Sequence, residues 1–269
     1  MILPINFYYF TSPAAAARVN KAAKTMKKLS KAAIYAKYGI VYKNGKIETP
    51  IGTMPELLKV GNRKTGAAVR TWSMNQTTCP CHCPGCYAGF GCYQFAGVKE
   101  SLRRNTELAK NHLGFLRRAL VAQCETFKPS TEIRIHAVGD FFSLDYLNMW
   151  HDIAAAFPNL IFWTYTKVGA FENAFNDLEN ANIVKSVVPG FGFNFGHCGY
   201  VIDMYHALIA TGVKVHICRC GIDPGQHCAG CHKCSECEYV LFVEHSTSYK
   251  ATEDARYNEL VDLIENQKY

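Results

Sequence analysis

The sequence predicts an α/β protein, built as an incomplete (β/α)6 TIM-type barrel. Short β-branched or apolar runs bounded by turn residues alternate with segments whose apolar residues recur every three or four positions. This alternation favours a parallel sheet with helical crossovers. Roughly six such strand–helix units fit into the chain, and its 269 residues with 49% apolar content can bury a core of barrel size.

A basic extension is expected ahead of the barrel, over residues 1–56. Ser12 and Pro13 suit the start of a helix that runs to residue 37. One face of this helix is apolar, and the opposite face carries Lys21, Lys24, Lys28 and Lys31. Residues 1–47 hold nine Lys or Arg and no Asp or Glu. The lysine face is either an ordinary solvated face or an electrostatic footprint for nucleic acid. Asn44-Gly45 predicts a hairpin turn after the helix.

The barrel itself is expected over residues 57–217, and a cysteine-rich segment with the last strand and a C-terminal helix over residues 218–269. The first strand is predicted at residues 69–74, followed by one long or two shorter helices over residues 98–127. Further strands are expected at 133–138, 160–166, 183–188, 213–217 and 239–243, and further helices at 143–156, 171–181, 199–211 and 253–266.

A cysteine loop separates the first strand from the first barrel helix. Read as Cys79-x3-Cys83-x2-Cys86, it offers three thiolates that can hold three irons of a [4Fe–4S] cluster and leave the fourth iron without a protein ligand. The loop's prolines and glycine keep it out of a helix. A rival reading is a closed zinc site formed by Cys81, Cys83, Cys86 and Cys92.

The loop carries a resemblance to known families. Its x3–x2 spacing resembles the signature of the radical S-adenosylmethionine (SAM) superfamily. The longer stretch Cys83-Pro-Gly-Cys86-Tyr-Ala-Gly-Phe-Gly-Cys-Tyr93 is similar to phage and mobile-element proteins that carry the gene-product-eighty-eight domain. Gly61-Asn-Arg-Lys-Thr-Gly66, His136-Ala-Val-Gly-Asp-Phe141 and the cysteines after Cys218 extend the likeness. One departure is Gly85, which stands where the superfamily usually has an aromatic residue.

The resemblance implies an enzyme. SAM would bind the open iron, and an external one-electron reductant of flavodoxin or ferredoxin type would drive its cleavage to methionine and a 5′-deoxyadenosyl radical. That radical would abstract hydrogen from an unidentified substrate, with nucleic acid one candidate. The alternative hypothesis is a non-catalytic, zinc- or iron–sulfur-bearing protein that binds nucleic acid.

Two further motifs fall where the predicted strands end, which is where chemistry collects in a parallel barrel. Gly139-Asp140 stands in place of the Gly-Gly-Glu-like turn of radical SAM proteins and would receive the SAM ammonium. Thr166-Lys167 would bind the SAM ribose and carboxylate. The competing interpretations are a helix cap for Asp140 and a solvated strand end for Lys167.

The second cysteine cluster is Cys220-x7-Cys228-x2-Cys231-x2-Cys234. Four thiolates at this spacing can close a structural zinc site or hold a second [4Fe–4S] cluster. Because Cys218 and Cys237 flank the set, the ligand quartet stays open among six cysteines.

The expected compartment is the cytoplasm. Thirteen cysteines clustered in short spacings, without a recognisable secretion signal, indicate metal binding in a reducing environment rather than disulfides. The sequence shows no apolar run near the length of a membrane span, so no membrane association is expected.

Overall fold

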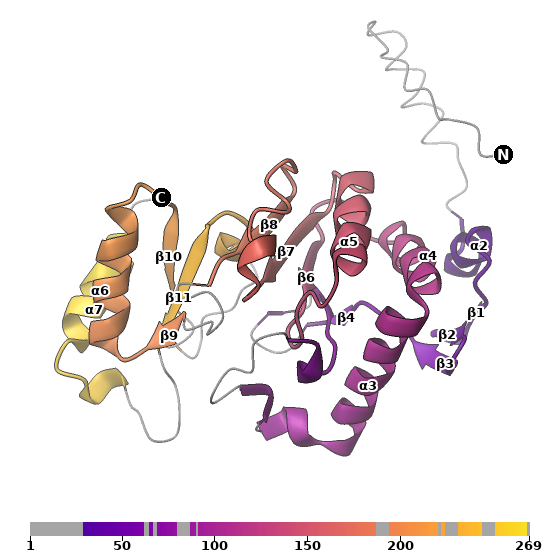
Figure 1. The fold of residues 1–269 in the computed structure, drawn as a ribbon, viewed down its shortest axis with the longest axis horizontal. Coiled ribbons are helices and arrows are strands. Elements are labelled where there is room, and N and C mark those ends of the chain that lie inside the picture. The colour runs from indigo at the N-terminus through magenta and orange to yellow at the C-terminus, as the bar shows by residue number, and fades with distance from the viewer. Residues whose placement is uncertain are drawn as a thin grey trace, which may run out of the picture.

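The computed structural model describes residues 29–61, 65–66, 69–79, 87–89, 91–186, 194–219, 222–223, 231–243 and 251–267. The chain is a mixed α/β protein, and its described strands form three separate sheets (Figure 1). No closed barrel forms among these described strands. None of the described helices is both long and apolar enough to cross a bilayer.

A five-stranded sheet organises the centre of the molecule, in the order β4-β5-β6-β7-β8. Its parallel part is β5 (Val69–Trp72), β6 (Glu132–Ile135), β7 (Ile161–Tyr165) and β8 (Ala181–Val184). The short edge strand β4 (Lys59–Val60) runs antiparallel to β5. Because β5 to β8 are parallel and adjacent in chain order, their carboxyl ends meet along one edge of the sheet.

Three helices cover one face of this sheet: α3 (Ala96–Asn111), α4 (Leu113–Cys124) and α5 (Leu144–Ala156) (Figure 1). The inward residues of the strands, such as Ile133, Ile135 and Phe162, are fully buried against these helices. The expected helical region 98–127 is therefore two helices. They break at His112, whose backbone leaves the helical conformation. Ser143 caps α5 as predicted, by accepting a hydrogen bond from the Tyr146 amide.

The other face of the sheet presents a different row of side chains. Thr71, Arg134, Trp163 and Asn182 are register partners across four strands. They alternate with the helix-covered residues and so point away from the helices. This face receives the short helix η6 (Lys233–Ser235) of the cysteine-rich segment, because the Asn182 amide donates to the carbonyls of Cys234 and Cys237 at 2.9 and 2.8 Å.

The C-terminal part has its own sheet and core. Strands β9 (Phe195–Gly196), β10 (Val215–Cys218) and β11 (Tyr239–Val243) are parallel, in the order β10-β11-β9. Helices α6 (Cys198–Ile209) and α7 (Tyr257–Glu265) pack on them through a second hydrophobic cluster that includes Val201, Ile217 and Leu260. The Lys185 amide, which follows β8, donates to the Glu238 carbonyl ahead of β11 and joins the two sheets.

The N-terminal extension is described from residue 29 onward. Helix α2 (Lys31–Lys37) begins after Ser30, whose hydroxyl caps it. The hairpin predicted at Asn44-Gly45 is confirmed: both residues have positive φ between β1 (Tyr42–Lys43) and β2 (Lys46–Thr49). A third strand, β3 (Gly52–Pro55), extends this hairpin and was not predicted. Ser12, Pro13, Lys21, Lys24 and Lys28 lie outside the described residues.

One predicted helix is wrong. The 3₁₀ turn η4 (Gly169–Phe171) ends where that helix should begin, and turns follow it up to the start of β8 at Ala181. Phe171, Phe175 and Leu178 do face the core at helical spacing. The side chain of Asn180, however, forms hydrogen bonds to backbone carbonyls outside this segment, which competes with helix formation. The Asn180 amide donates to the carbonyls of Ala154, Phe157 and Leu160 at 3.0–3.1 Å, which fixes the chain against the end of α5.

Candidate functional site at the carboxyl edge of the central sheet

The cysteine loop leaves β5 through a short capped turn. Asn75 accepts a hydrogen bond from the Thr77 amide and starts the 3₁₀ turn η1 (Gln76–Thr78), and the Cys79 amide donates to the Gln76 carbonyl. This turn leaves Cys79 half-buried just beyond the carboxyl end of β5. The structure thus fixes where the loop begins. Cys83 and Cys86, and the rival ligand Cys81, lie outside the described residues.

Gly139 packs directly against this turn. Its φ of 93° lies in the left-handed region, and a β-carbon added there would stand 2.8 Å from the Thr78 hydroxyl oxygen and 3.1 Å from the Met74 β-carbon. A side chain at residue 139 would therefore be strained and would clash with the residue before Cys79. The glycine lets the loop after β6 lie on the loop after β5.

Asp140 ties three loops together. Its backbone amide lies 3.3 Å from the Thr78 hydroxyl oxygen, to which it donates. Its carboxylate accepts from the Thr166 hydroxyl, the Lys167 amide and the Phe141 amide at 2.8–2.9 Å. The side chain is almost completely buried, and this burial raises the pKa of Asp140 while the hydrogen bonds oppose the rise.

The Thr166-Lys167 pair is held by that same carboxylate. Thr166 is fully buried; its hydroxyl donates to Asp140 and accepts from the Val168 amide. Lys167 is half-buried, and its backbone amide donates to the Asp140 carboxylate. The four residues predicted to bind the cofactor are thus brought together. Asp140 and Thr166 use their polar atoms to hold the protein's own loops.

A buried network next to this edge escaped the sequence analysis. His136 follows β6 with a positive φ of 64° and is 3% exposed. Its Nε2 lies 2.9 Å from the Tyr146 hydroxyl, which also accepts from the Trp72 indole at 2.8 Å. Burial lowers the pKa of His136 to about 3. The signal available in the sequence was a lone histidine at a strand end between apolar residues, which does not distinguish a core residue from a ligand.

The cysteine-rich segment lies on the face of the central sheet that is not covered by α3, α4 and α5, where Asn182 donates to the carbonyls of Cys234 and Cys237. The Cys234 Sγ is 3.0 Å from the Tyr165 hydroxyl, and burial raises the pKa of Cys234 to about 12. The Cys231 Sγ is 4.0 Å from Nε2 of His216, a buried residue of β10. His216 and Tyr165 were not predicted as neighbours of this cluster.

Two more contacts fix the segment. His232, in a left-handed conformation, is hydrogen-bonded to the buried carboxylate of Glu132, which also accepts from the Trp163 indole. Cys218 and Cys237 pack with Cys234 in one apolar cluster. Of the predicted quartet, Cys231 and Cys234 are described, and Cys220 and Cys228 lie outside the described residues. Within the described part of the chain, no three His, Cys, Asp or Glu side chains are placed to hold a metal ion.

These features define a class: a mixed α/β protein in which a cysteine loop follows the first parallel strand, and a second cysteine-rich segment packs on the sheet face opposite helices α3, α4 and α5. Residues 27–189 match the family model described as gene product 88, and the chain belongs to that family. No curated protein and no solved structure matches the chain.

Proposed function

We propose that this protein is a radical SAM enzyme built on a partial barrel, with its reaction centre at the carboxyl edge of the central sheet. The observation that carries the proposal is the Asp140 junction. Asp140 is hydrogen-bonded to Thr78, Thr166 and Lys167. These bonds bring the start of the cysteine loop, the Gly139-Asp140 turn and the Thr166-Lys167 pair together at one edge of the sheet. A site assembled from the ends of several parallel strands is the usual arrangement in barrel enzymes.

The donor chemistry of the cysteine loop suits an iron–sulfur cluster. Cys79, Cys83 and Cys86 would hold it, and three thiolates leave one iron available to an external ligand. When bound, such a cluster supplies the electron that cleaves SAM. The described start of the loop supports this role, since Cys79 leaves the sheet at the edge where the other motifs gather.

The chain's own residues would then divide the work. Asp140 and Thr166 act by positioning, because their polar atoms already bind loop backbone. The Lys167 ammonium would pair with an anionic group, such as the SAM carboxylate. Gly139 lets the loop after β6 approach Met74 and Thr78, which precede Cys79, closely.

The C-terminal cysteines would hold a second centre, either zinc or a second [4Fe–4S] cluster. Cys220, Cys228, Cys231 and Cys234 remain the proposed ligands, with Cys218 and Cys237 as their nearest replacements. The contacts that support this second centre are those of Cys231 with His216 and of Cys234 with Tyr165. An external reductant of flavodoxin or ferredoxin type completes the proposed system.

Metal analysis of anaerobically purified protein tests the proposal. We expect about four irons with equimolar sulfide for the first site, and a Cys83→Ala variant that loses them while keeping the metal of the second. Purified protein that contains only zinc, with the same content in the variant, would favour the non-catalytic alternative and overturn the enzyme.

A further inference from the structure

The segment that carries Cys231 and Cys234 forms a tight turn on the central sheet. Cys234 lies inside η6, and His232 enters that turn with a left-handed φ of 55°. The amide and the hydroxyl of Ser235 both donate to the His232 carbonyl, at 3.0 and 2.6 Å. These hydrogen bonds close the turn without using either thiol. Two cysteines at C-x2-C spacing in one turn are the usual half of a thiolate metal site.

Asn182 holds this turn from the central sheet. Its side-chain amide donates to the carbonyls of Cys234 and Cys237, at 2.9 and 2.8 Å. An amide nitrogen carries two hydrogens, so each carbonyl can receive one of them. The bond to the Cys234 carbonyl fixes the backbone from which that thiol projects.

Glu132 holds the turn at its other end. Its carboxylate, which is 4% exposed at the start of β6, is bound to Nδ1 of His232 and accepts from the Trp163 indole at 3.1 Å. Hydrogen bonds to an ionised carboxylate are stronger than those between neutral groups. Because His232 directly follows Cys231, this contact fixes the backbone beside the other thiol.

The side chains that hold the turn come from three neighbouring strands. Glu132 belongs to β6, Tyr165 to β7 and Asn182 to β8, and the strand register places all three on the face opposite the helices. The Tyr165 hydroxyl lies 3.0 Å from the Cys234 Sγ. A paired sheet is a rigid support, so a metal that binds this turn meets cysteines that are already ordered. The binding free energy then loses less to ordering of the chain.

We propose that Asn182 and Glu132 are positioning residues of the second metal centre, which hold the Cys231–Cys234 turn in place before the metal binds. The inference rests on the proposed second centre, whose thiols have the chemistry that zinc and iron–sulfur clusters require. It adds that the central sheet determines how tightly that centre holds its metal. Removing partners that orient metal ligands costs about 10- to 100-fold in metal affinity.

The test is the rate at which metal leaves the second centre. Protein is purified anaerobically as the Cys83→Ala variant, which removes the first cluster, and is then mixed with excess EDTA. Iron and zinc that stay bound are measured over time by elemental analysis. Adding Asn182→Ala removes both donors from the turn, so we expect metal release at least about tenfold faster than from the parent.

Asn180→Ala is the matched control. The Asn180 amide also donates to backbone carbonyls, but these belong to Ala154, Phe157 and Leu160 rather than to the cysteine-rich segment. Both asparagine variants should lower the free energy of unfolding in urea, because both leave carbonyls without their donors. Only Asn182→Ala should also speed metal release. A merely structural asparagine would lower stability without this difference.

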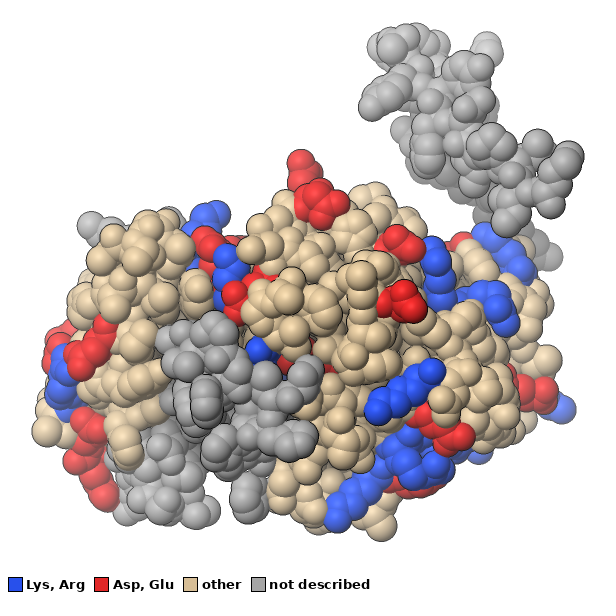
Figure 2. All heavy atoms as spheres, viewed as in Figure 1, with Lys and Arg blue, Asp and Glu red and all other residues tan. Residues whose placement is uncertain are grey.

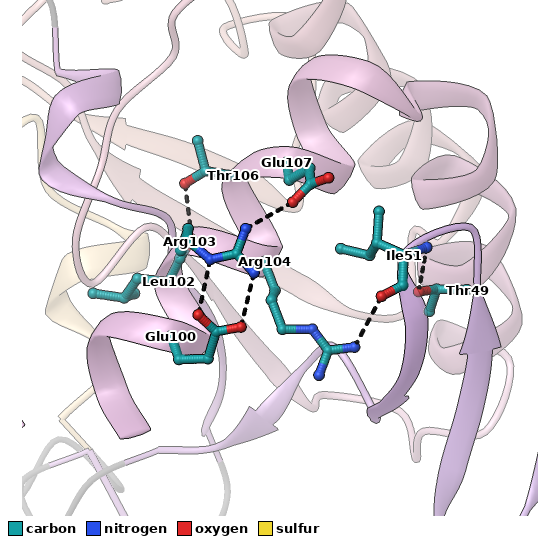
Figure 3. Close-up of polar contacts among 8 residues, drawn as sticks. All are labelled: Thr49, Ile51, Glu100, Leu102, Arg103, Arg104, Thr106 and Glu107. Atoms are coloured by element: carbon teal, nitrogen blue, oxygen red, sulfur yellow. Dashed lines mark hydrogen bonds and ion pairs between the residues drawn. The ribbon is translucent and has the colours of Figure 1, made fainter. Parts of the chain in front are cut away.

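His232→Asn tests the other anchor. Asparagine tolerates the left-handed backbone, and its shorter side chain withdraws from Glu132, so metal release should again be faster. A surface comparison comes from the outer side of α3, where Figure 2 shows Lys and Arg side chains gathered. There Arg103→Gln removes the ion pairs with Glu100 and Glu107 (Figure 3) and should leave the release rate unchanged.

Equal release from the Asn182 and Asn180 variants would overturn the positioning role and leave the second centre standing. Release from His232→Asn no faster than from the parent would overturn the role of Glu132, and this comparison also decides if the Asn182 variant does not fold. A parent protein that contains no metal would refute the second centre and its positioning residues together. The activity proposed for the first site is measured separately, as SAM cleavage by the protein with Cys83 intact.

Discussion

Replacing Asp140 by Asn tests whether one carboxylate organises the carboxyl edge. The amide keeps one oxygen but turns the other into a donor, which then faces a buried donor such as the Lys167 amide. An unsatisfied buried donor costs about 1–3 kcal/mol. Removing the buried charge offsets part of this, since burial already raises the pKa of Asp140. The net expected loss of unfolding free energy is about 1–2 kcal/mol.

The assay is urea unfolding followed by tryptophan fluorescence, with Asp140→Ala as the stronger variant. Alanine leaves the Phe141 amide, the Lys167 amide and the Thr166 hydroxyl without their acceptor, so its loss should reach about 3 kcal/mol or more. Asp177→Asn is the matched control, because that carboxylate is exposed and binds only His151 among the described side chains. Its expected effect is below about 0.5 kcal/mol. If Asp140→Asn were no more destabilising than Asp177→Asn, the junction would not hold the loops.

Three further outcomes follow from the same geometry. Gly139→Ala should destabilise the protein by about 1–3 kcal/mol in the same urea assay, because it combines a positive φ with a clash against Thr78. The control is Gly97→Ala, at an exposed position inside α3 with open space around it, which should not destabilise the protein. Equal effects of the two substitutions would contradict the packing of Gly139 on Thr78. The pKa of His136 falls to about 3 in the folded state, so between about pH 6.5 and pH 3 only the unfolded chain protonates this histidine. His136 therefore removes about 1.4 kcal/mol of stability for each pH unit of acidification in that range. The His136→Asn variant should lose less stability than wild type between about pH 7 and pH 5, and parallel losses would refute a buried, neutral His136. Cys83→Ala should lose the proposed first cluster, whereas Cys124→Ala should keep it, because Cys124 is buried in the helical core at 2% exposure; iron and sulfide analysis decides, and iron retained in the Cys83 variant would contradict the ligand set.

The central sheet was predictable because its strands are short apolar runs between clear turn signals. Strands β5, β6, β7 and β8 lie within a few residues of their predicted positions. The two-residue strand β4 was missed, since pairing with its neighbour β5 rather than local sequence creates it. The predicted helix at 171–181 was wrong because apolar spacing alone could not reveal that Asn180 would bind the carbonyls at the end of α5.

The site was predictable as a location and less so as a set of contacts. Because they follow the ends of predicted parallel strands, Gly139-Asp140 and Thr166-Lys167 were expected at one edge of the sheet. In the structure, hydrogen bonds join the two pairs there. The sequence could not show that the Asp140 carboxylate accepts hydrogen bonds from Thr166 and from loop backbone amides, because these bonds depend on how deeply Asp140 is buried. The packing of Cys234 on Tyr165 was likewise invisible, since the two residues are far apart in the chain.

The measurement that tests the central claim most directly is anaerobic incubation of the reduced, iron-reconstituted protein with SAM. The products are separated by liquid chromatography. The account predicts 5′-deoxyadenosine and methionine from wild type and neither from Cys83→Ala. A wild-type protein that carries a full iron–sulfur cluster and still forms no 5′-deoxyadenosine would contradict the proposed activity, as would equal product from the Cys83 variant.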